Sequence, residues 1–328
     1  MDAAGFRLLN DFQRGFPLCE RPYLEIAQRL GQSEHWVLAK LARLELAGVV
    51  GRIGAVFAPN TIGASTLVAA AVPPEALERV AQAVNRFPEV NHNYERDHAF
   101  NLWFVVTAAD SGRLARTLAA IERQAQCGPL LSLPLLEEYR IDLGFDLRDG
   151  HTQGGAAPAL AARVALDRGE QCLVAAVEEG LLLVPRPYAA LADCCGLSEK
   201  RVLETLQRWQ VQGLIRRFGV IVRHRPLGFR ANAMVVWDVP DAAARGFGLR
   251  LAADPRVSLC YRRARAERWN YNLYCMLHGR EEAQVRERLA GLRRAAGLES
   301  FPCQVLFSRR SFKQTAARYA PLEVLADA

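Results

Sequence analysis

The chain has 328 residues, of which 51% are hydrophobic and 23% charged, and its formal net charge at pH 7 is +7. This length and composition predict about two globular domains, and no run approaches the roughly 18 consecutive apolar residues that a membrane-spanning helix needs. The first residues, "MDAAGFRLLNDF", lack the basic and apolar segments of a secretion signal, so we expect a cytoplasmic protein without a membrane partner. The mild basic excess is compatible with a polyanionic partner, either nucleic acid or a polycarboxylate, and also with an ordinary basic surface.

The cysteines do not indicate a metal site or a disulfide framework. No C-x-x-C pair occurs, and two of the cysteines are adjacent in the sequence. We therefore expect reduced, small core residues at all eight positions: Cys19, Cys127, Cys172, Cys194, Cys195, Cys260, Cys275 and Cys303.

The first residues predict a winged helix-turn-helix. A helix is expected near Phe6 to Gln13 and a second from Pro22 to Leu30, with Gly31 as its C-cap. Ser33 is the expected N-cap of a third helix that ends near Ala47. The following stretch "GVVGRIGAVF", residues 48–57, predicts the β-strands of a wing.

The next segment predicts a ferredoxin-like domain. A strand at 66–72 is followed by a helix at 73–87, a strand pair at 90–97 and 100–108, a helix at 111–125, and a last strand within 136–145. The resulting order β-α-β-β-α-β is that of the ferredoxin-like split unit.

The chain repeats this plan. Residues 21–63 align without a gap with residues 186–228, with 15 identities in 43 positions, including Arg52 with Arg217. A second matched block aligns Tyr94 with Tyr261 and Arg96 with Arg263. The fold class is therefore α+β, a tandem repeat of winged helix-turn-helix and ferredoxin-like domains forming a pseudodimer.

Domain boundaries follow from the repeat. The winged helices are predicted at 1–56 and 164–222, and the ferredoxin-like domains at 57–147 and 223–328. The Gly- and Ala-rich segment at 148–163 is the predicted linker between the two halves.

The two-domain plan resembles the Lrp/AsnC family of transcription regulators, so DNA binding is the first function to consider. A recognition helix presents donors to DNA from its N-terminal residues. Here those residues include Glu34 and Glu199, whose carboxylates would face a polyanion. Lys200 and Arg201 favour DNA binding only in the second half, so we expect DNA binding to be a minor or absent property.

The stretch "HNYERDH", residues 92–98, is too polar on both faces for a core strand. An extended strand places His92, Tyr94, Arg96 and His98 on one face.

Cations concentrate in other segments, namely "IRRFGVIVRHRPLGFR", "YRRAR" and "SRRSFKQTAARY". Strand alternation predicts that Arg223 and Arg225 share a face, with Arg217 if the strand is continuous. One interpretation is a solvated basic surface, and the other is a pocket for a ligand with many carboxylates, which guanidinium groups bind bidentately.

These motifs carry a more specific resemblance. "VNHNYERDHAFNLWF" in the first half, and "RRFGVIVRHRPLGFRANAMVVW", "WNYNLYCMLHGR" and "LFSRRSFK" in the second, resemble the two subunit types of siroheme decarboxylase, here fused in one chain. The resemblance implies a carbon-carbon lyase that removes carbon dioxide from two acetate side chains of siroheme. The product, didecarboxysiroheme, leads to d-type heme or, by another route, to protoheme.

The resemblance also implies site residues. His92 and His98 are the candidates for proton donor and axial ligand of the substrate iron, with Tyr94 and Arg96 as orienter and carboxylate clamp; which imidazole has which role stays open. Trp103, Phe100, Trp269, Tyr271 and Tyr274 are the expected apolar walls. The expected substrate-binding residues are Arg52, Arg217, Arg223, Arg225, Tyr261, Arg263, Trp269, Arg310 and Lys313. No cofactor is expected beyond the iron of the substrate.

The second half departs from this pattern. Leu259 matches His92, and Trp269 matches His98. Either the first half carries the acid chemistry and the second mainly holds carboxylates, or a homologous decarboxylase subunit is needed as a partner. A homodimer is also compatible with the pattern. The rival hypotheses are an Lrp/AsnC-like regulator that senses a small ligand or tetrapyrrole, and a heme-binding or trafficking protein.

Overall fold

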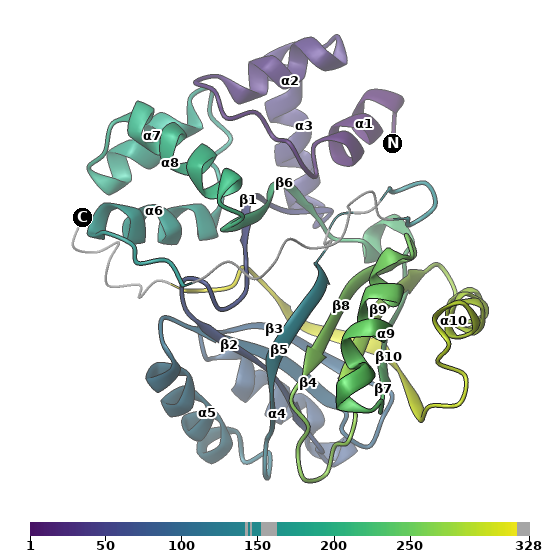
Figure 1. Ribbon diagram of the computed structural model, residues 1–328. Coiled ribbons are helices and arrows are strands. Elements are labelled where there is room, and N and C mark those ends of the chain that lie inside the picture. The colour runs from purple at the N-terminus through teal and green to yellow at the C-terminus, as the bar shows by residue number, and fades with distance from the viewer. Residues whose placement is uncertain (142–143, 145, 152–162, 320–328) are drawn as a thin grey trace. The chain divides into compact units, whose positions relative to one another are not determined.

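A computed structural model describes residues 1–141, 144, 146–151 and 163–319 (Figure 1). Most of the predicted linker lies outside these residues. The chain divides into two compact units: the winged-helix unit holds 1–62 and the described residues of 161–227, with Tyr319, and the barrel unit holds the described residues of 63–160 and 228–318. Among the described residues, no helix has both the length and the apolar character required to cross a bilayer.

The winged-helix unit contains both helix-turn-helix motifs. Gly31 ends the second helix in the left-handed conformation, with φ of 65°, and the Ser33 side chain accepts a hydrogen bond from the Trp36 amide, so both predicted caps are confirmed. The elements of the first half are α1 (Ala3–Asp11), α2 (Pro22–Leu30), α3 (Glu34–Leu46) and β1 (Val50–Phe57). Those of the second half are α6 (Arg168–Glu179), α7 (Pro187–Cys195), α8 (Glu199–Val211) and β6 (Ile215–Val222).

The wing differs from the prediction. Each half supplies one strand, and β1 pairs antiparallel with β6, with Gly54 opposite Gly219. A Cβ atom at Gly219 would collide with the carbonyl oxygens of Phe12 and Gln13, which lie against the strand of the other half. The expectation of several strands within residues 48–57 was therefore wrong, because the partner of this strand comes from the other half and not from a local hairpin.

The helices of each half also bond to the other half. The Tyr23 hydroxyl donates to the carbonyl oxygen of Leu182 at 2.9 Å, and the Tyr188 hydroxyl donates to that of Pro17 at 2.7 Å. The two hydroxyls occupy repeat-equivalent positions. The two winged helices are thus one intertwined unit.

The barrel unit confirms the β-α-β-β-α-β order in each half. The first half contributes β2 (Ala64–Ala70), the 3-10 turn η1 (Pro74–Ala76), α4 (Leu77–Asn85), β3 (Val90–Arg96), β4 (Leu102–Ala108), α5 (Ser111–Ala125) and β5 (Leu131–Ile141). The second half contributes β7 (Ala231–Trp237), α9 (Asp241–Ala253), β8 (Val257–Arg263), β9 (Leu273–Gly279), α10 (Glu282–Ala296) and β10 (Cys303–Gln314). A further 3-10 turn, η2 (Arg225–Leu227), precedes β7 in the chain and belongs to the winged-helix unit.

The eight strands close into one barrel in the order β10-β3-β4-β2-β5-β8-β9-β7. The last strand of each half joins both halves: β5 pairs with β2 and then β8, and β10 pairs with β7 and then β3. The two ferredoxin-like sheets therefore form a pseudodimer within one chain.

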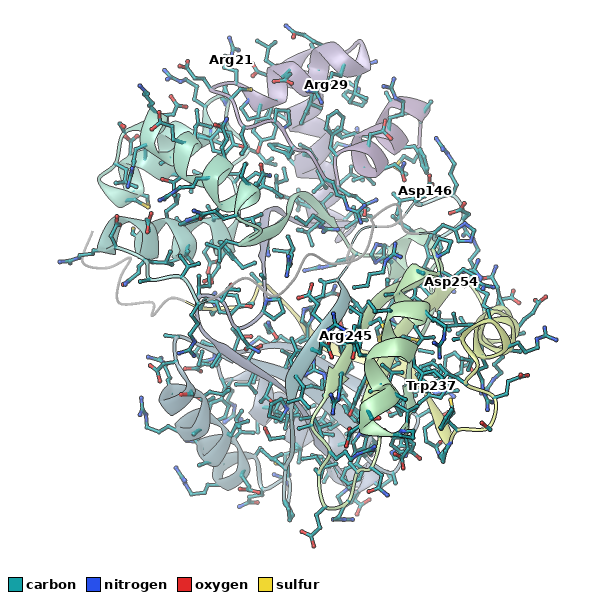
Figure 2. The ribbon with its side chains drawn as sticks, viewed as in Figure 1. Arg21, Arg29, Asp146, Trp237, Arg245 and Asp254 are labelled. Carbon is teal, nitrogen blue, oxygen red and sulfur yellow. The ribbon has the colours of Figure 1, made fainter. Side chains whose placement is uncertain are left out.

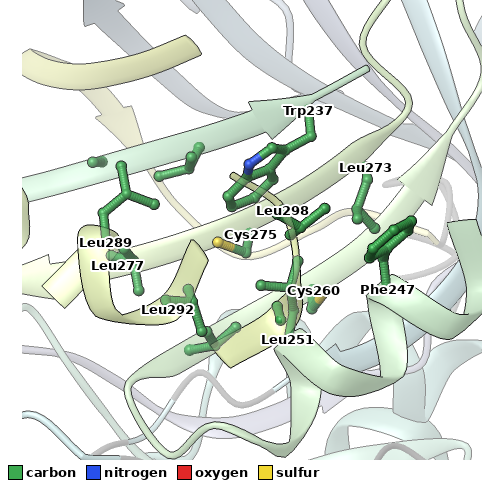
Figure 3. Packing of buried hydrophobic residues seen from close by; sticks show 14 of the residues in the cluster. Trp237, Phe247, Leu251, Cys260, Leu273, Cys275, Leu277, Leu289, Leu292 and Leu298 are labelled. Atoms are coloured by element: carbon green, nitrogen blue, oxygen red, sulfur yellow. The ribbon is translucent and has the colours of Figure 1, made fainter. Parts of the chain in front are cut away.

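Alternation along the strands separates two kinds of core. Outward-facing residues pack under the helices, as Figure 3 shows for Trp237 and Leu273 beside Phe247 of α9 and Leu289 of α10. Inward-facing residues of both halves meet inside the barrel, including Leu67, Trp103, Leu133, Met234, Tyr274 and Leu306. All eight cysteines carry free thiols, and Cys127, Cys172, Cys195, Cys260 and Cys275 are buried; Cys194 is exposed, so the expectation of a core position was wrong there.

Candidate functional site

Strand β3 presents His92 and Tyr94 to the inside of the barrel. His92 lies opposite Val105 and Tyr94 opposite Trp103, and both partners belong to the inner core. Asn93, between them, points outward and donates to the Ala81 carbonyl oxygen at 3.2 Å. The Tyr94 hydroxyl lies 3.5 Å from Nδ1 of His92, and the two rings are stacked with centroids 6.0 Å apart.

Arg96 lies at the end of β3 and is only 8% exposed. Its Nη1 donates to the Leu306 carbonyl oxygen at 3.0 Å, and its guanidinium carbon lies 5.8 Å from the centre of the Tyr94 ring. Its Nε has no hydrogen-bond partner in the described part of the chain. Burial lowers the pKa of Arg96 to about 10, while Tyr94 and Tyr261 act in the opposite direction. A buried guanidinium without a carboxylate favours the binding of an anion.

The second half repeats this arrangement with Arg263. Its Nη1 donates to the Leu133 carbonyl oxygen at 2.8 Å, and its guanidinium carbon lies 4.7 Å from the centre of the Tyr261 ring. The Tyr–Arg pair predicted from the repeat is therefore brought to the barrel interior from both halves.

His98 lies outside the strand. Strand β3 ends at Arg96, and the chain turns there because the His98 amide donates to the Arg96 carbonyl oxygen at 2.9 Å. The expectation that one extended face runs through His98 was therefore wrong. Nδ1 of His98 accepts a hydrogen bond from the Phe100 amide at 3.0 Å, and burial lowers the pKa of His98, partly opposed by Asp97.

The predicted aromatic residues cluster in the inner core. The Trp269 ring lies 5.4 Å from His98, 5.1 Å from Trp103 and 4.8 Å from Tyr271, measured between ring centroids. Trp269 also donates from Nε1 to the Tyr274 hydroxyl at 2.7 Å. Phe100 packs against the same indole with centroids 5.9 Å apart. One end of the inner face is thus aromatic and packed.

Four predicted arginines belong to the winged-helix unit. Arg217 is 6% exposed; burial, with repulsion from Arg14 and Arg52, lowers its pKa to about 9. Burial also lowers the pKa of Arg52 to about 10, although Glu178 and Glu179 favour its charge. Strand β6 ends at Val222, so Arg223 and Arg225 follow the strand and do not continue the face of Arg217 as expected.

Arg310 and Lys313 lie on strand β10, on the opposite side of the sheet from His92 and Tyr94. Arg310 forms ion pairs with Glu95 and with Glu78, the latter at 3.0 Å. Lys313 donates to the carbonyl oxygens of Asn85 and Phe87 at the end of α4, both at 2.9 Å. Both predicted substrate ligands are therefore engaged by partners on the outer side.

The structure adds His278, which the sequence reasoning missed. This imidazole on β9 lies between two polar side chains: its Nδ1 is 2.6 Å from Oδ1 of Asn232, and its Nε2 is 2.7 Å from Oγ of Ser258. Burial, with the nearby charges of Arg96 and Arg288, lowers the pKa of His278 to about 4. Strand alternation from Tyr274 through Met276 could have found it, since His278 continues the inward face.

The described residues do not form a metal site, and the recognition helices do not favour DNA binding. Within the described ranges, no group of three or more His, Cys, Asp and Glu side chains is placed to hold a metal ion. Glu34 forms an ion pair with Arg21, which is labelled in Figure 2, and Glu199 pairs in the same way with Arg186. These carboxylates are held at the start of the recognition helices, where they disfavour DNA phosphates.

Two family models match the chain. The AsnC-like ligand binding domain matches residues 62–140 and 226–313, and the siroheme decarboxylase NirDL-like HTH domain matches residues 6–50 and 170–216. Together they cover both halves in the order that the repeat predicts.

Relatives and a solved structure agree with these models. The chain is 43% identical over 321 residues to the siroheme decarboxylase NirDL subunit of Paracoccus denitrificans (strain Pd 1222), covering 98% of each chain. It is 51% identical to the NirD subunit of Stutzerimonas stutzeri over 149 residues, 45% of this chain and 97% of that protein. A crystal structure of siroheme decarboxylase NirDL in complex with an iron-uroporphyrin III analogue superimposes with a TM-score of 0.67 and 27% identity, covering 98% of this chain and 95% of the other.

Proposed function

Because the chain belongs to the siroheme decarboxylase family, we propose that it removes the carboxylates of two acetate side chains of siroheme without oxidation, giving didecarboxysiroheme. It is a decarboxylase, a carbon-carbon lyase. Each step breaks the bond between the acetate methylene and its carboxylate, releases carbon dioxide, and adds one proton to the methylene carbon to give a methyl group. The product serves the biosynthesis of d-type heme or the alternative heme route.

Arg96 is the single observation that best supports a carboxylate substrate at this site. Its guanidinium is buried, donates to one carbonyl oxygen, and makes no ion pair with a described carboxylate. A planar fork of N–H donors fits a carboxylate. Tight pairing with the reacting carboxylate would stabilise the ground state, so Arg96 is better suited to hold a neighbouring carboxylate and thereby orient the reacting acetate.

The chemistry requires desolvation and a proton. The conjugated macrocycle delocalises the electron pair that carbon dioxide leaves behind, and the aromatic inner core supplies a surface that excludes water from the reacting group. His92 is the proposed proton donor, because it shares the inner face of β3 with Tyr94, whose hydroxyl is within 3.5 Å of its ring nitrogen. His98, beside Trp269, is proposed to position the substrate at the aromatic end.

Arg263 and Tyr261, in the second half of the chain, are proposed to hold carboxylates of the substrate.

In this proposal, no cofactor is required beyond the iron of the substrate. The partners proposed are a second copy of the chain or homologous decarboxylase subunits. The eight free thiols support a reducing compartment, and we propose the cytoplasm.

The test is anaerobic incubation of the purified protein with siroheme, followed by mass spectrometry of the tetrapyrrole. Successive loss of two carbon dioxide molecules is the expected result. His92→Ala should slow the reaction, whereas His35→Ala, which removes an exposed imidazole from the winged-helix unit, should not. Intact siroheme after long incubation with wild-type protein that binds it would contradict the proposal.

A further inference from the structure

The hydrogen bonds of His278 to Asn232 and Ser258 fix which ring nitrogen carries the proton. An amide oxygen only accepts, so the contact of 2.6 Å between Oδ1 of Asn232 and Nδ1 of His278 requires the proton on Nδ1. In the neutral ring, Nε2 then carries a lone pair. The Ser258 hydroxyl, 2.7 Å away, donates to that lone pair.

The imidazole of His98 has the opposite arrangement. Its Nδ1 accepts from the Phe100 amide at 3.0 Å, so the proton of the neutral ring lies on Nε2, which is then a donor. The Nε2 atoms of His98 and His278 therefore differ in kind: the first offers a proton and the second a lone pair.

His278 also has the surroundings of a metal ligand. Histidines that bind metals usually donate the other ring N–H to an oxygen acceptor, which fixes the tautomer and the ring orientation, and Asn232 provides that acceptor. The side chain is partly exposed and continues the inward face of β9, close enough to Arg96 for the guanidinium to affect its ionisation. Ser258 has a second acceptor, the Met276 carbonyl oxygen at 3.3 Å, and can turn to it when Nε2 is engaged.

We propose that Nε2 of His278 is the axial ligand of the siroheme iron and that Asn232 is the positioning residue that holds the ring for this bond. The proposal rests on the proposed function and deepens it: Arg96 and His278 act on the same substrate molecule, one on its carboxylates and the other on its metal. His92 is then left for proton donation.

The experiment measures the iron in protein loaded with ferric siroheme, by optical and electron paramagnetic resonance spectra. The wild type, His92→Ala and His98→Ala should share the signature of an axial nitrogen, which His278→Ala should lose and regain with added imidazole. Ser258→Ala is the matched control, because it removes a contact of the same nitrogen but keeps the ring; its signature should match that of the wild type. A His278→Ala protein that binds siroheme with the wild-type signature would overturn the proposal.

Asn232→Asp provides a second test if His278→Ala does not fold. A carboxylate in place of the amide oxygen makes the imidazole a stronger electron donor, so the reduction potential of bound siroheme should fall. An unchanged potential would overturn the proposal, because an imidazole bound to the iron would transmit the added negative charge to it.

Failure here is distinguishable from failure of the proposed function. Turnover of siroheme by wild-type protein, together with an unaltered iron signature in His278→Ala, would leave the decarboxylase in place and remove only the ligand. Absence of siroheme turnover by wild-type protein would count against the function itself.

Discussion

Arg96 and Arg263 make equivalent hydrogen bonds across the barrel unit: each arginine donates to a backbone carbonyl oxygen of the other half. Nη1 of Arg96 donates to the Leu306 carbonyl oxygen on β10, and Nη1 of Arg263 donates to the Leu133 carbonyl oxygen on β5. Each arginine thus bonds to the last strand of the half to which it does not belong. The internal symmetry provides two related cations, but only Arg96 shares its strand with an inward imidazole.

This asymmetry predicts different effects of matched substitutions. Arg96→Lys should lower kcat/KM for siroheme by about 10- to 100-fold, because a charge-assisted hydrogen bond contributes on the order of 1.5–3 kcal/mol and lysine lacks the planar fork. Arg263→Lys should chiefly raise KM. Steady-state rates with siroheme measure both. Equal losses of kcat in the two variants would contradict the functional asymmetry.

Substitution of the first-half imidazoles tests the proton donor. His92→Ala, which removes the proposed proton donor, and His98→Ala, which removes the proposed positioning residue, should each reduce turnover at least about tenfold; a general acid typically contributes about 10²- to 10⁴-fold. The readout is the rate of carbon dioxide release. Wild-type rates in both variants, with His35→Ala as the control, would exclude this region as the site.

The lowered pKa of His278 predicts that the stability of the protein is sensitive to acid. Burial lowers its pKa to about 4 from the ordinary 6.5, so the unfolded state binds more protons than the folded state between these values. The contribution of this histidine therefore becomes destabilising as pH falls from about 6.5 towards 4, reaching up to about 3 kcal/mol. Urea unfolding at pH 7 and pH 5 should show a smaller loss of stability in His278→Gln than in the wild type. Identical losses would contradict it.

Substitution of Arg140 should change the stability of the fold and not the site. Its Nη1 donates to the Ala252 carbonyl oxygen at 2.6 Å, at the end of α9, just as Lys313 donates to carbonyl oxygens at the end of α4. Arg140→Met should lower the free energy of unfolding by about 1–3 kcal/mol, because buried carbonyl groups lose their donor. Chemical denaturation measures this, with the exposed Arg286→Met as control. Equal stabilities of these two variants would contradict the assigned role.

The recognition helices predict the absence of specific DNA binding. Glu34 and Glu199 are held by ion pairs near their N-termini, while Lys200 and Arg201 lie near Glu204 and Asp167, at 3.9 and 3.8 Å. A gel shift on the DNA upstream of the coding sequence should show only weak binding that salt abolishes. Specific binding that is lost in Lys200→Ala and Arg201→Ala would instead favour a regulator.

Local signals in the sequence predicted much of the fold. The caps at Gly31 and Ser33 and the order of strands and helices depend on residues near one another, and the strand period of two correctly placed His92 and Tyr94 on one face. The pairing of individual strands across the two halves, such as β1 with β6 and β10 with β3, could not be predicted in this way. No residue of β1 or β10 specifies which half supplies its partner.

The candidate site was harder to predict where the backbone departs from regular alternation. The register of β10 against β3 shifts twice, between Ser308 and Arg310 and between Ser311 and Lys313, so counting along the strand does not give the outward faces of Arg310 and Lys313. The turn after Arg96 likewise removes His98 from the strand. His278 was not predicted for another reason: it is a single histidine in an otherwise apolar strand, so no local pattern distinguishes it.

The pairing of β5 and β10 with strands of the other half affects how the chain folds. Neither half alone contains a closed barrel, because β5 and β10 each complete a sheet of the other half. Joining the halves makes their association intramolecular, with an effective concentration on the order of millimolar. Refolding of the whole chain should therefore be independent of protein concentration, whereas two separately produced halves should regain structure faster as they are mixed at higher concentration.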